Sequence, residues 1–203
     1  MVTRETALKI LHELGNSPNM VKHALACGYA MRALYQKLSS DTSLDTPGMS
    51  EPMDPQNWEV VGLLHDADYE LTNKSLENHT EETTKRLKAN GVSQPIIDAI
   101  RGHCDKAPRK TLMAKAIYAC DELTGLIVAC TLVQPDLPAG EAGKKLKSVS
   151  VQSVLKKFKD NSFARGANRD QIKTCESQLN IPLSDFISIV LAAMQDHASE
   201  LGL

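Results

Sequence analysis

The sequence predicts an all-α domain, and two observations carry this prediction. Aromatic residues make up only 4% of the 203 residues, and leucine, alanine, isoleucine and valine dominate the apolar set. Apolar residues recur at helical spacing over long stretches, whereas runs that alternate β-branched and polar residues, as half-buried strands do, are few. A hydrophobic share of 42% over this length suits one compact domain.

The predicted domain begins with two helices. One covers residues 3–14, where apolar residues share a face until a glycine ends the helix. The second covers residues 18–38, because Ser17 can cap it and a proline suits its first position. His23 lies on the buried stripe of this long helix. Residues 39–57 are rich in Ser, Thr, Asp and Pro, which is typical of a surface loop.

The remaining helices follow from the same signals. A short, very apolar helix is expected over residues 58–65, and residues 68–78 form a polar connection. Further helices are expected over residues 79–90, capped by Asn78; 93–103, capped by Ser93; 111–133; 168–180; and, after Pro182, 184–201. The Pro- and Gly-rich residues 134–143 indicate a boundary between two parts of the chain. We therefore divide the chain into a helical domain at 1–133 and a C-terminal helical extension at 134–203 that packs on the same core.

Composition limits the classes of function. The 23 basic and 25 acidic residues give a net charge of −2, so no global basic field indicates a nucleic-acid partner. No apolar stretch reaches the ~18 uncharged residues of a membrane span, and the first residues lack the layout of a signal peptide. We expect a cytoplasmic protein. The five cysteines are odd in number and form no CxxC pair, which favours reduced, packed thiols over disulfides.

One apolar run ends in a pair of chemically active residues. Residues 60–64 read Val-Val-Gly-Leu-Leu and lead directly into His65 and Asp66. We expect this run to be buried, but an unpartnered carboxylate in a low-dielectric interior is very unfavourable. A metal ion would resolve the conflict, since imidazole nitrogen and carboxylate oxygen are both good ligands of divalent ions.

More residues of the same two types occur in or beside the neighbouring predicted helices. In chain order, the candidate ligands are His23, His65, Asp66, His79, His103 and Asp121. Together with the segments Asp98–His103 and Ala116–Asp121, this order resembles the HD superfamily of metal-dependent hydrolases over roughly residues 20–124. The resemblance implies a compact helical HD-domain bundle, here with additional C-terminal helices.

The resemblance also implies roles for these residues. The family's four ligands of one ion correspond to His23, His65, Asp66 and Asp121. The two extra histidines of its binuclear branch correspond to His79 and His103, and there Asp66 would bridge both ions. The cofactor is thus expected to be one or two divalent ions from among Fe, Mn, Zn, Ni and Mg. The sequence departs from the common pattern at Asp68, where Gly-Lys usually begins, and at Cys104, where a second His is frequent.

A basic segment at residues 144–169 is a candidate for substrate binding. Arginine offers a bidentate fork to phosphate and lysine a point charge, and here both are interleaved with aromatic residues. The candidates for a phosphate clamp are Lys156, Arg165 and Arg169. The alternative is a solvated helix face without such a role. Lys106 and Arg109 are rival candidates, since they follow the late histidine directly.

These features predict a metal-dependent phosphohydrolase. It would act on a small phosphorylated substrate, with a nucleotide as the favoured class, through a metal-activated water, and Asp66 and His65 would be its catalytic residues. Neither a membrane nor a nucleic-acid polymer is expected as a partner. The alternative is an HD-type di-iron oxygenase acting on a small polar or phosphonate-like substrate, because the resemblance extends to such enzymes. A non-catalytic scaffold is disfavoured, since buried His and Asp without an ion destabilise a fold.

Overall fold

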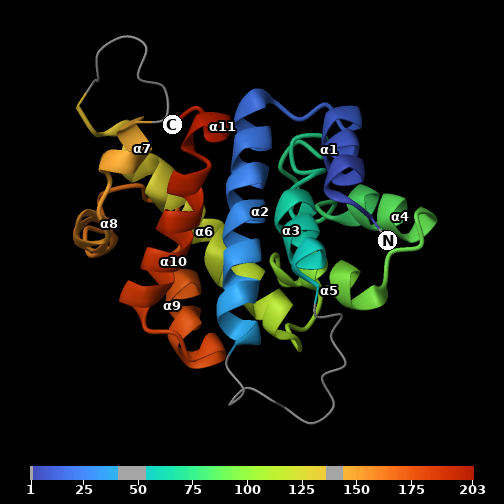
Figure 1. Ribbon diagram of the computed structural model, residues 1–203. Coiled ribbons are helices and arrows are strands. Elements are labelled where there is room, and N and C mark those ends of the chain that lie inside the picture. The colour runs from blue at the N-terminus through green and yellow to red at the C-terminus, as the bar shows by residue number, and fades with distance from the viewer. Residues whose placement is uncertain (1, 41–53, 136–143) are drawn as a thin grey trace.

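The computed structural model describes residues 2–40, 54–135 and 144–203, and every regular element within these ranges is a helix. This confirms the all-α prediction. Of the predicted loops at 39–57 and 134–143, residues 41–53 and 136–143 lie outside the described residues, while residues 55–57 are helical and not part of a loop. In Figure 1, α2 runs through the middle of the molecule, with α1, α3, α4 and α5 on one side and α7 to α10 on the other.

The N-terminal helices begin where local capping places them. In α1 (Arg4–Glu13), the Thr3 side chain accepts a hydrogen bond from the backbone N–H of Thr6. In α2 (Pro18–Ser39), the Ser17 hydroxyl accepts from the backbone N–H of Met20, as predicted. Such a cap satisfies one of the amide donors that the first helical turn leaves unpaired.

Helix α3 (Pro55–Leu64) starts three residues earlier than predicted. The Asp54 side chain accepts from the Gln56 N–H at 2.8 Å, and Pro55 takes the first helical position. Nearly all of α3 is buried against α2. The contact is close at Gly62, where a Cβ atom would lie 2.5 Å from the carbonyl oxygen of Cys27 on α2. This close approach places the end of α3, with the His-Asp pair, beside the middle of α2.

The next three helices are α4 (Glu81–Ala89), α5 (Gln94–Gly102) and α6 (Leu112–Leu132). The predicted start of α4 is wrong by two residues. Asn78 does not cap it, and the preceding residue, Thr80, has a φ of 68° and makes no side-chain cap. The side chain that meets the start of α4 comes from Asp68, in the polar connection. A cap that is distant in sequence leaves no local signal.

The C-terminal helices complete the same core. They are α7 (Lys144–Ser148), α8 (Val151–Phe158), α9 (Arg169–Leu179), α10 (Leu183–Asp196) and α11 (Ala198–Leu201). Helix α9 packs on α6, and α10 packs on α2. The single helix predicted over 184–201 is in fact two, because the chain bends at His197, whose ring stacks on Tyr29 with centroids 3.7 Å apart.

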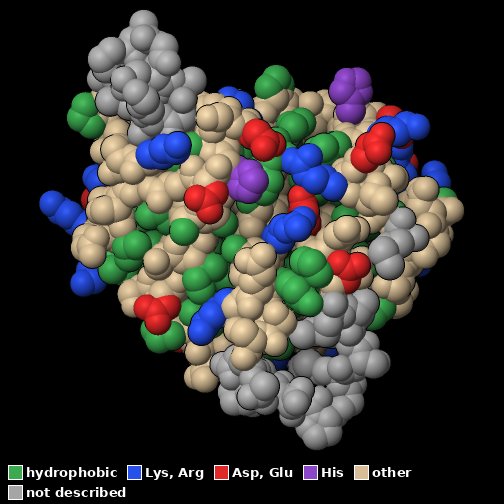
Figure 2. All heavy atoms as spheres, in the orientation of Figure 1, with side chains coloured by type: hydrophobic (Ala, Val, Ile, Leu, Met, Phe, Trp, Pro, Cys, Tyr) green, Lys and Arg blue, Asp and Glu red, His purple; other side chains and the backbone are tan. Residues whose placement is uncertain are grey.

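The surface carries charges of both signs. On the face in Figure 2, basic and acidic side chains are interspersed and do not gather into one large patch. No single helix among the described residues is long and apolar enough to cross a membrane. Helices α9 and α10 pass that test only as a pair, across a bend of 106°. All five cysteines are unpaired, as expected.

Candidate metal centre

The six predicted ligands come from five places in the chain and converge on one point. Each lies on a helix or directly beside a helix end, so packing of the helices positions it. His23 lies in α2, His65 and Asp66 follow α3, His79 precedes α4, His103 follows α5 and Asp121 lies in α6. They form two groups that share Asp66.

The first group brings two imidazoles and two carboxylates together. The Nε2 atoms of His23 and His65 are 3.2 Å apart. Asp121 Oδ1 lies 3.1 Å from His23 Nε2 and 3.4 Å from His65 Nε2. Asp66 Oδ2 lies 3.7 Å from each of the same two nitrogens. Four donor atoms from three places in the chain, α2, the end of α3 and α6, therefore surround one small volume, as ligands of a tetrahedral ion do.

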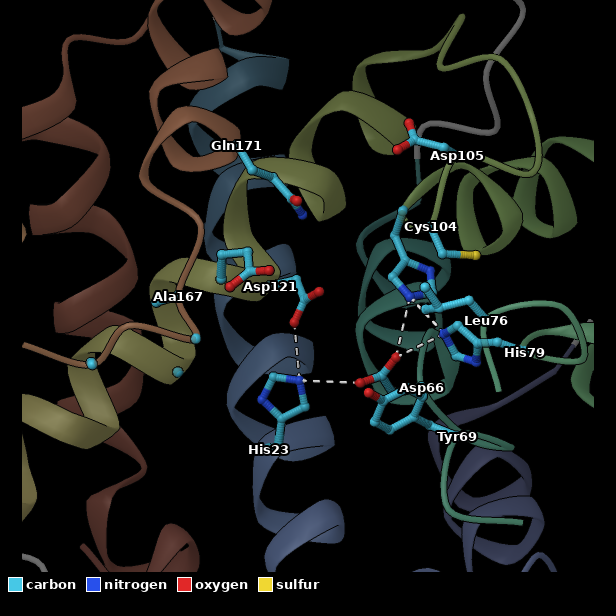
Figure 3. A pocket seen from close by; sticks show the side chains of 15 residues that line it. His23, Asp66, Tyr69, Leu76, His79, Cys104, Asp105, Asp121, Ala167 and Gln171 are labelled. Atoms are coloured by element: carbon cyan, nitrogen blue, oxygen red, sulfur yellow. Dashed lines mark hydrogen bonds and ion pairs between the residues drawn. The ribbon is translucent and has the colours of Figure 1, made fainter. Parts of the chain in front are cut away.

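The second group uses the other oxygen of Asp66. Its Oδ1 lies 3.1 Å from His79 Nε2 and 3.1 Å from His103 Nε2, and these two nitrogens are 3.0 Å apart. Figure 3 shows Asp66 between His23 on one side and His79 on the other. The two oxygens of one carboxylate thus face two separate sets of imidazoles, which is the arrangement of a bridging ligand.

The four histidines present the same nitrogen to the centre because the other nitrogen is occupied. His65 Nδ1 donates to the Gly62 carbonyl at 2.8 Å, and His103 Nδ1 donates to the Ile100 carbonyl at 2.5 Å. His23 Nδ1 lies 3.5 Å from the Thr124 hydroxyl, which itself donates to the Asp121 carbonyl. Such partners fix the tautomer and the ring orientation of a ligating histidine.

Asp68 orients the fourth histidine, and sequence reasoning missed this role. Its side chain is fully buried, and Oδ1 accepts from His79 Nδ1 at 3.0 Å and from the Thr80 N–H at 2.7 Å, while Oδ2 accepts from the Thr83 N–H at 2.9 Å. One carboxylate therefore joins the second group to the start of α4. The sequence offers one signal, the departure from the family pattern at Asp68, two residues beyond Asp66.

Without a metal ion, the imidazoles and carboxylates form a charged network. A bound cation would take the place of the protons on the imidazoles. Burial disfavours the imidazolium of His65, but the combined effect of Asp66, Cys27 and Asp121 outweighs burial and raises the pKa of His65 to about 10. Burial likewise opposes ionisation of Asp66, yet the surrounding imidazoles hold the pKa of its carboxyl well below the ordinary value. Metal ions require neutral imidazoles and ionised carboxylates, so binding here would release protons. The donor types, their burial and their convergence fit one or two divalent ions.

A thiol adjoins each group. Cys27 Sγ lies 3.9 Å from His23 Nε2 and 3.2 Å from the Thr124 hydroxyl, and Cys104 lies beside His79 and His103. Cys27 is buried, whereas Cys104 is partly exposed in the pocket wall. Burial raises the pKa of the Cys104 thiol, which favours its neutral form.

The two groups open into a pocket of about 580 Å³. Its floor is the metal centre, and its walls come from the connection after α3, the segment after α5, helix α6, the loop before α9 and α9 itself. Besides five of the six ligands, the lining residues are Tyr69, Leu76, Cys104, Asp105, Glu122, Gly125, Ala164, Gly166, Ala167 and Gln171.

The structure does not bring the predicted phosphate clamp to this pocket. Lys156 is exposed on α8, and Arg165 and Arg169 line a second hollow behind the loop before α9. Arg169 is engaged structurally, since its guanidinium donates to the carbonyls of Phe163, Ala164 and Ala167 at 2.5–2.6 Å. Arginine with five donors can hold several carbonyls at once, so it shapes the loop that forms the pocket wall.

The two rival cations are engaged as well. Lys106 Nζ donates to the carbonyls of Glu77 and His79, both at 2.5 Å, and so ties down the segment that carries a predicted ligand. Arg109 donates to the Gly102 carbonyl and pairs with Asp105, and its guanidinium lies 3.7 Å from the centroid of the Tyr118 ring. Neither residue lines the pocket.

Comparison with known proteins concerns the part of the chain that contains the predicted ligands. Neither a curated protein nor a solved structure matches the chain. The family model of the HD domain matches residues 20–126, a stretch that contains all six predicted ligands and covers more than half of the chain. By this match, the chain belongs to the HD domain family.

Proposed function

We propose that this protein is a metal-dependent phosphohydrolase that acts on a small phosphorylated substrate. The single observation that carries the proposal is the position of Asp66, whose two oxygens face two separate imidazole groups at 3.1–3.7 Å. Two divalent ions held in this way would polarise a phosphoryl oxygen and lower the pKa of a bound water. Membership of the HD domain family supports the same class of reaction.

The chain's own residues supply positioning. Asp66 and His65 hold the centre at the buried end of α3, and the backbone carbonyl of Gly62 keeps the His65 ring turned toward it. Asp68 does the same for His79. The pocket volume of about 580 Å³ lies within the range of small-molecule sites, which supports a small phosphorylated substrate.

Metal content and hydrolysis in one variant test the proposal. We expect the purified protein to hold two divalent ions and to hydrolyse p-nitrophenyl phosphate or a nucleoside monophosphate. Asp66→Ala should lose both ions and the activity together, because this carboxylate belongs to both groups. Asp98→Asn is the matched control, since the Asp98 carboxylate bonds only Gln94 on the exposed face of α5. Wild-type metal content and activity in Asp66→Ala would refute the proposal.

The ligand types also support a second candidate, an oxygenase. Four imidazoles and two carboxylates suit iron as well as manganese or zinc. Metal analysis of protein purified without oxygen, followed by assays with and without air, separates the two candidates. Hydrolysis that proceeds equally in both atmospheres supports the phosphohydrolase, whereas product formation that requires oxygen supports the oxygenase.

A further inference from the structure

The part of the pocket wall that α6 forms carries a carboxylate with only one oxygen in a hydrogen bond. Glu122 directly follows the predicted ligand Asp121 and lines the pocket. Its Oε2 accepts from the backbone N–H of Asn168 at 3.0 Å, and among the described residues Oε1 has no partner. This wall therefore presents an unpartnered carboxylate oxygen to whatever enters the pocket.

The adjoining helix α9 adds a second acceptor. Gln171 Nε2 donates to the backbone carbonyl of Tyr118 at 2.8 Å. A carbonyl can only accept, so the amide nitrogen must face Tyr118, and the amide oxygen remains available. Figure 3 shows the amide end of Gln171 directed toward the pocket, on the same side as Asp121. Two acceptors from neighbouring helices thus face the same space.

No lysine or arginine is among the described residues that line this pocket. Three cations that adjoin its walls are held by other groups: Arg169 by three backbone carbonyls, Lys106 by the carbonyls of Glu77 and His79, and Arg109 by the carboxylate of Asp105. Two divalent ions would carry four positive charges, of which the Asp66 and Asp121 carboxylates would offset two and a phosphate dianion the other two. With the phosphoryl group bound, the Glu122 carboxylate would then have no cationic partner among the described residues.

We propose that the pocket selects phosphorylated substrates that carry an ammonium group, which Glu122 and Gln171 bind. This inference rests on the proposed function, in which the metal centre binds the phosphoryl group. Glu122 and five of the six predicted ligands line the same pocket, so the ammonium and the phosphoryl group would bind in one cavity. A short linker between the two groups, as in an aminoalkyl phosphate, suits this arrangement. Additional phosphates, as in a nucleoside triphosphate, would face Glu122 and be repelled.

The test uses a matched pair of ligands that cannot be hydrolysed. The metal-loaded protein is titrated by calorimetry with 2-aminoethylphosphonate and with 2-hydroxyethylphosphonate, which differ only in the ammonium group. We expect the amino compound to bind at least about tenfold tighter, which is the effect of one charge-assisted hydrogen bond of about 1.4 kcal/mol. Glu122→Gln should reduce this preference to about twofold or less. Asp170→Asn, which removes an exposed charge outside the pocket, should keep it.

Each possible result either supports or overturns the ammonium site. Equal binding of the two phosphonates, or a preference that persists in Glu122→Gln, would overturn the ammonium site. Loss of a metal ion in Glu122→Gln would also overturn it, because Glu122 would then be a ligand. Phosphonates contain no hydrolysable ester, so the preference is measured independently of catalysis. If the preference is found in a protein that hydrolyses no phosphate ester, the proposed function fails and the ammonium site stands.

Discussion

Asp68 offers the sharpest test of how the two groups of ligands are built. Replacing it by asparagine keeps the shape of the side chain but turns one acceptor oxygen into an N–H donor. If that donor takes the place of Oδ2, it faces the N–H of Thr83. If it takes the place of Oδ1, it faces the N–H of Thr80 and the Nδ1 of His79. In either orientation at least one buried donor loses its partner.

The expected magnitudes follow from this arrangement. Asp68 is fully buried, and a buried donor without a partner costs about 1–3 kcal/mol, more when the lost acceptor was charged, so we expect Asp68→Asn to lower the free energy of unfolding by about 3 kcal/mol. Removing the carboxylate that orients a ligating histidine lowers metal affinity by about 10–100-fold. This loss should be confined to the group of His79 and His103, because the hydrogen bonds of the Asp68 carboxylate go to His79, Thr80 and Thr83, and among the described residues none joins it to His23 or Asp121.

Calorimetric metal titration and urea unfolding measure these two quantities. We expect Asp68→Asn to bind one ion with wild-type affinity and the other about 10–100-fold more weakly. Asp98→Asn removes an exposed carboxylate and should change neither quantity. Unchanged affinity at both sites would refute the role of Asp68 in orienting His79. An equal loss at both sites would show that the two groups are not separable in the way the hydrogen bonds indicate.

Two further predictions concern packing and protonation. Gly62→Ala would place a Cβ atom 2.5 Å from the backbone oxygen of Cys27, so α2 and α3 must separate; we expect at least about 3 kcal/mol of destabilisation in urea, and a wild-type midpoint would contradict the close approach. The raised pKa of about 10 keeps His65 protonated at neutral pH without metal. The metal must displace that proton, so apparent metal affinity should rise with pH, and the binding enthalpy should depend on the ionisation enthalpy of the buffer. In the metal-free protein, the stabilising contribution of His65 should be complete below pH 6.5 and lost as the pH rises through about 10. A binding enthalpy independent of buffer would contradict this account.

Sequence reasoning predicted several helix starts because capping is local, although the Ser93 side chain predicted to cap α5 makes no such hydrogen bond. Ser17 and Thr111 lie next to the turns whose amides their side chains accept, so the residues alone reveal them. The six candidate ligands were predicted for a related reason: each is a His or Asp in or beside an apolar stretch, in an order typical of one family. The tertiary structure brings all six together.

The tertiary structure alone decided how these parts combine. Asp68 caps α4 and orients His79 from more than ten residues away, and no local pattern reports such a contact. The same holds for Arg169, whose charge indicated a phosphate ligand but whose donors hold a loop. The sequence by itself determined which helices form and which residues can bind a metal, because capping and apolar periodicity act within a few residues. Only the packing of those helices decided that Asp66 joins two groups and that Glu122 faces a pocket whose described lining contains no lysine or arginine, because these relations depend on contacts between distant segments.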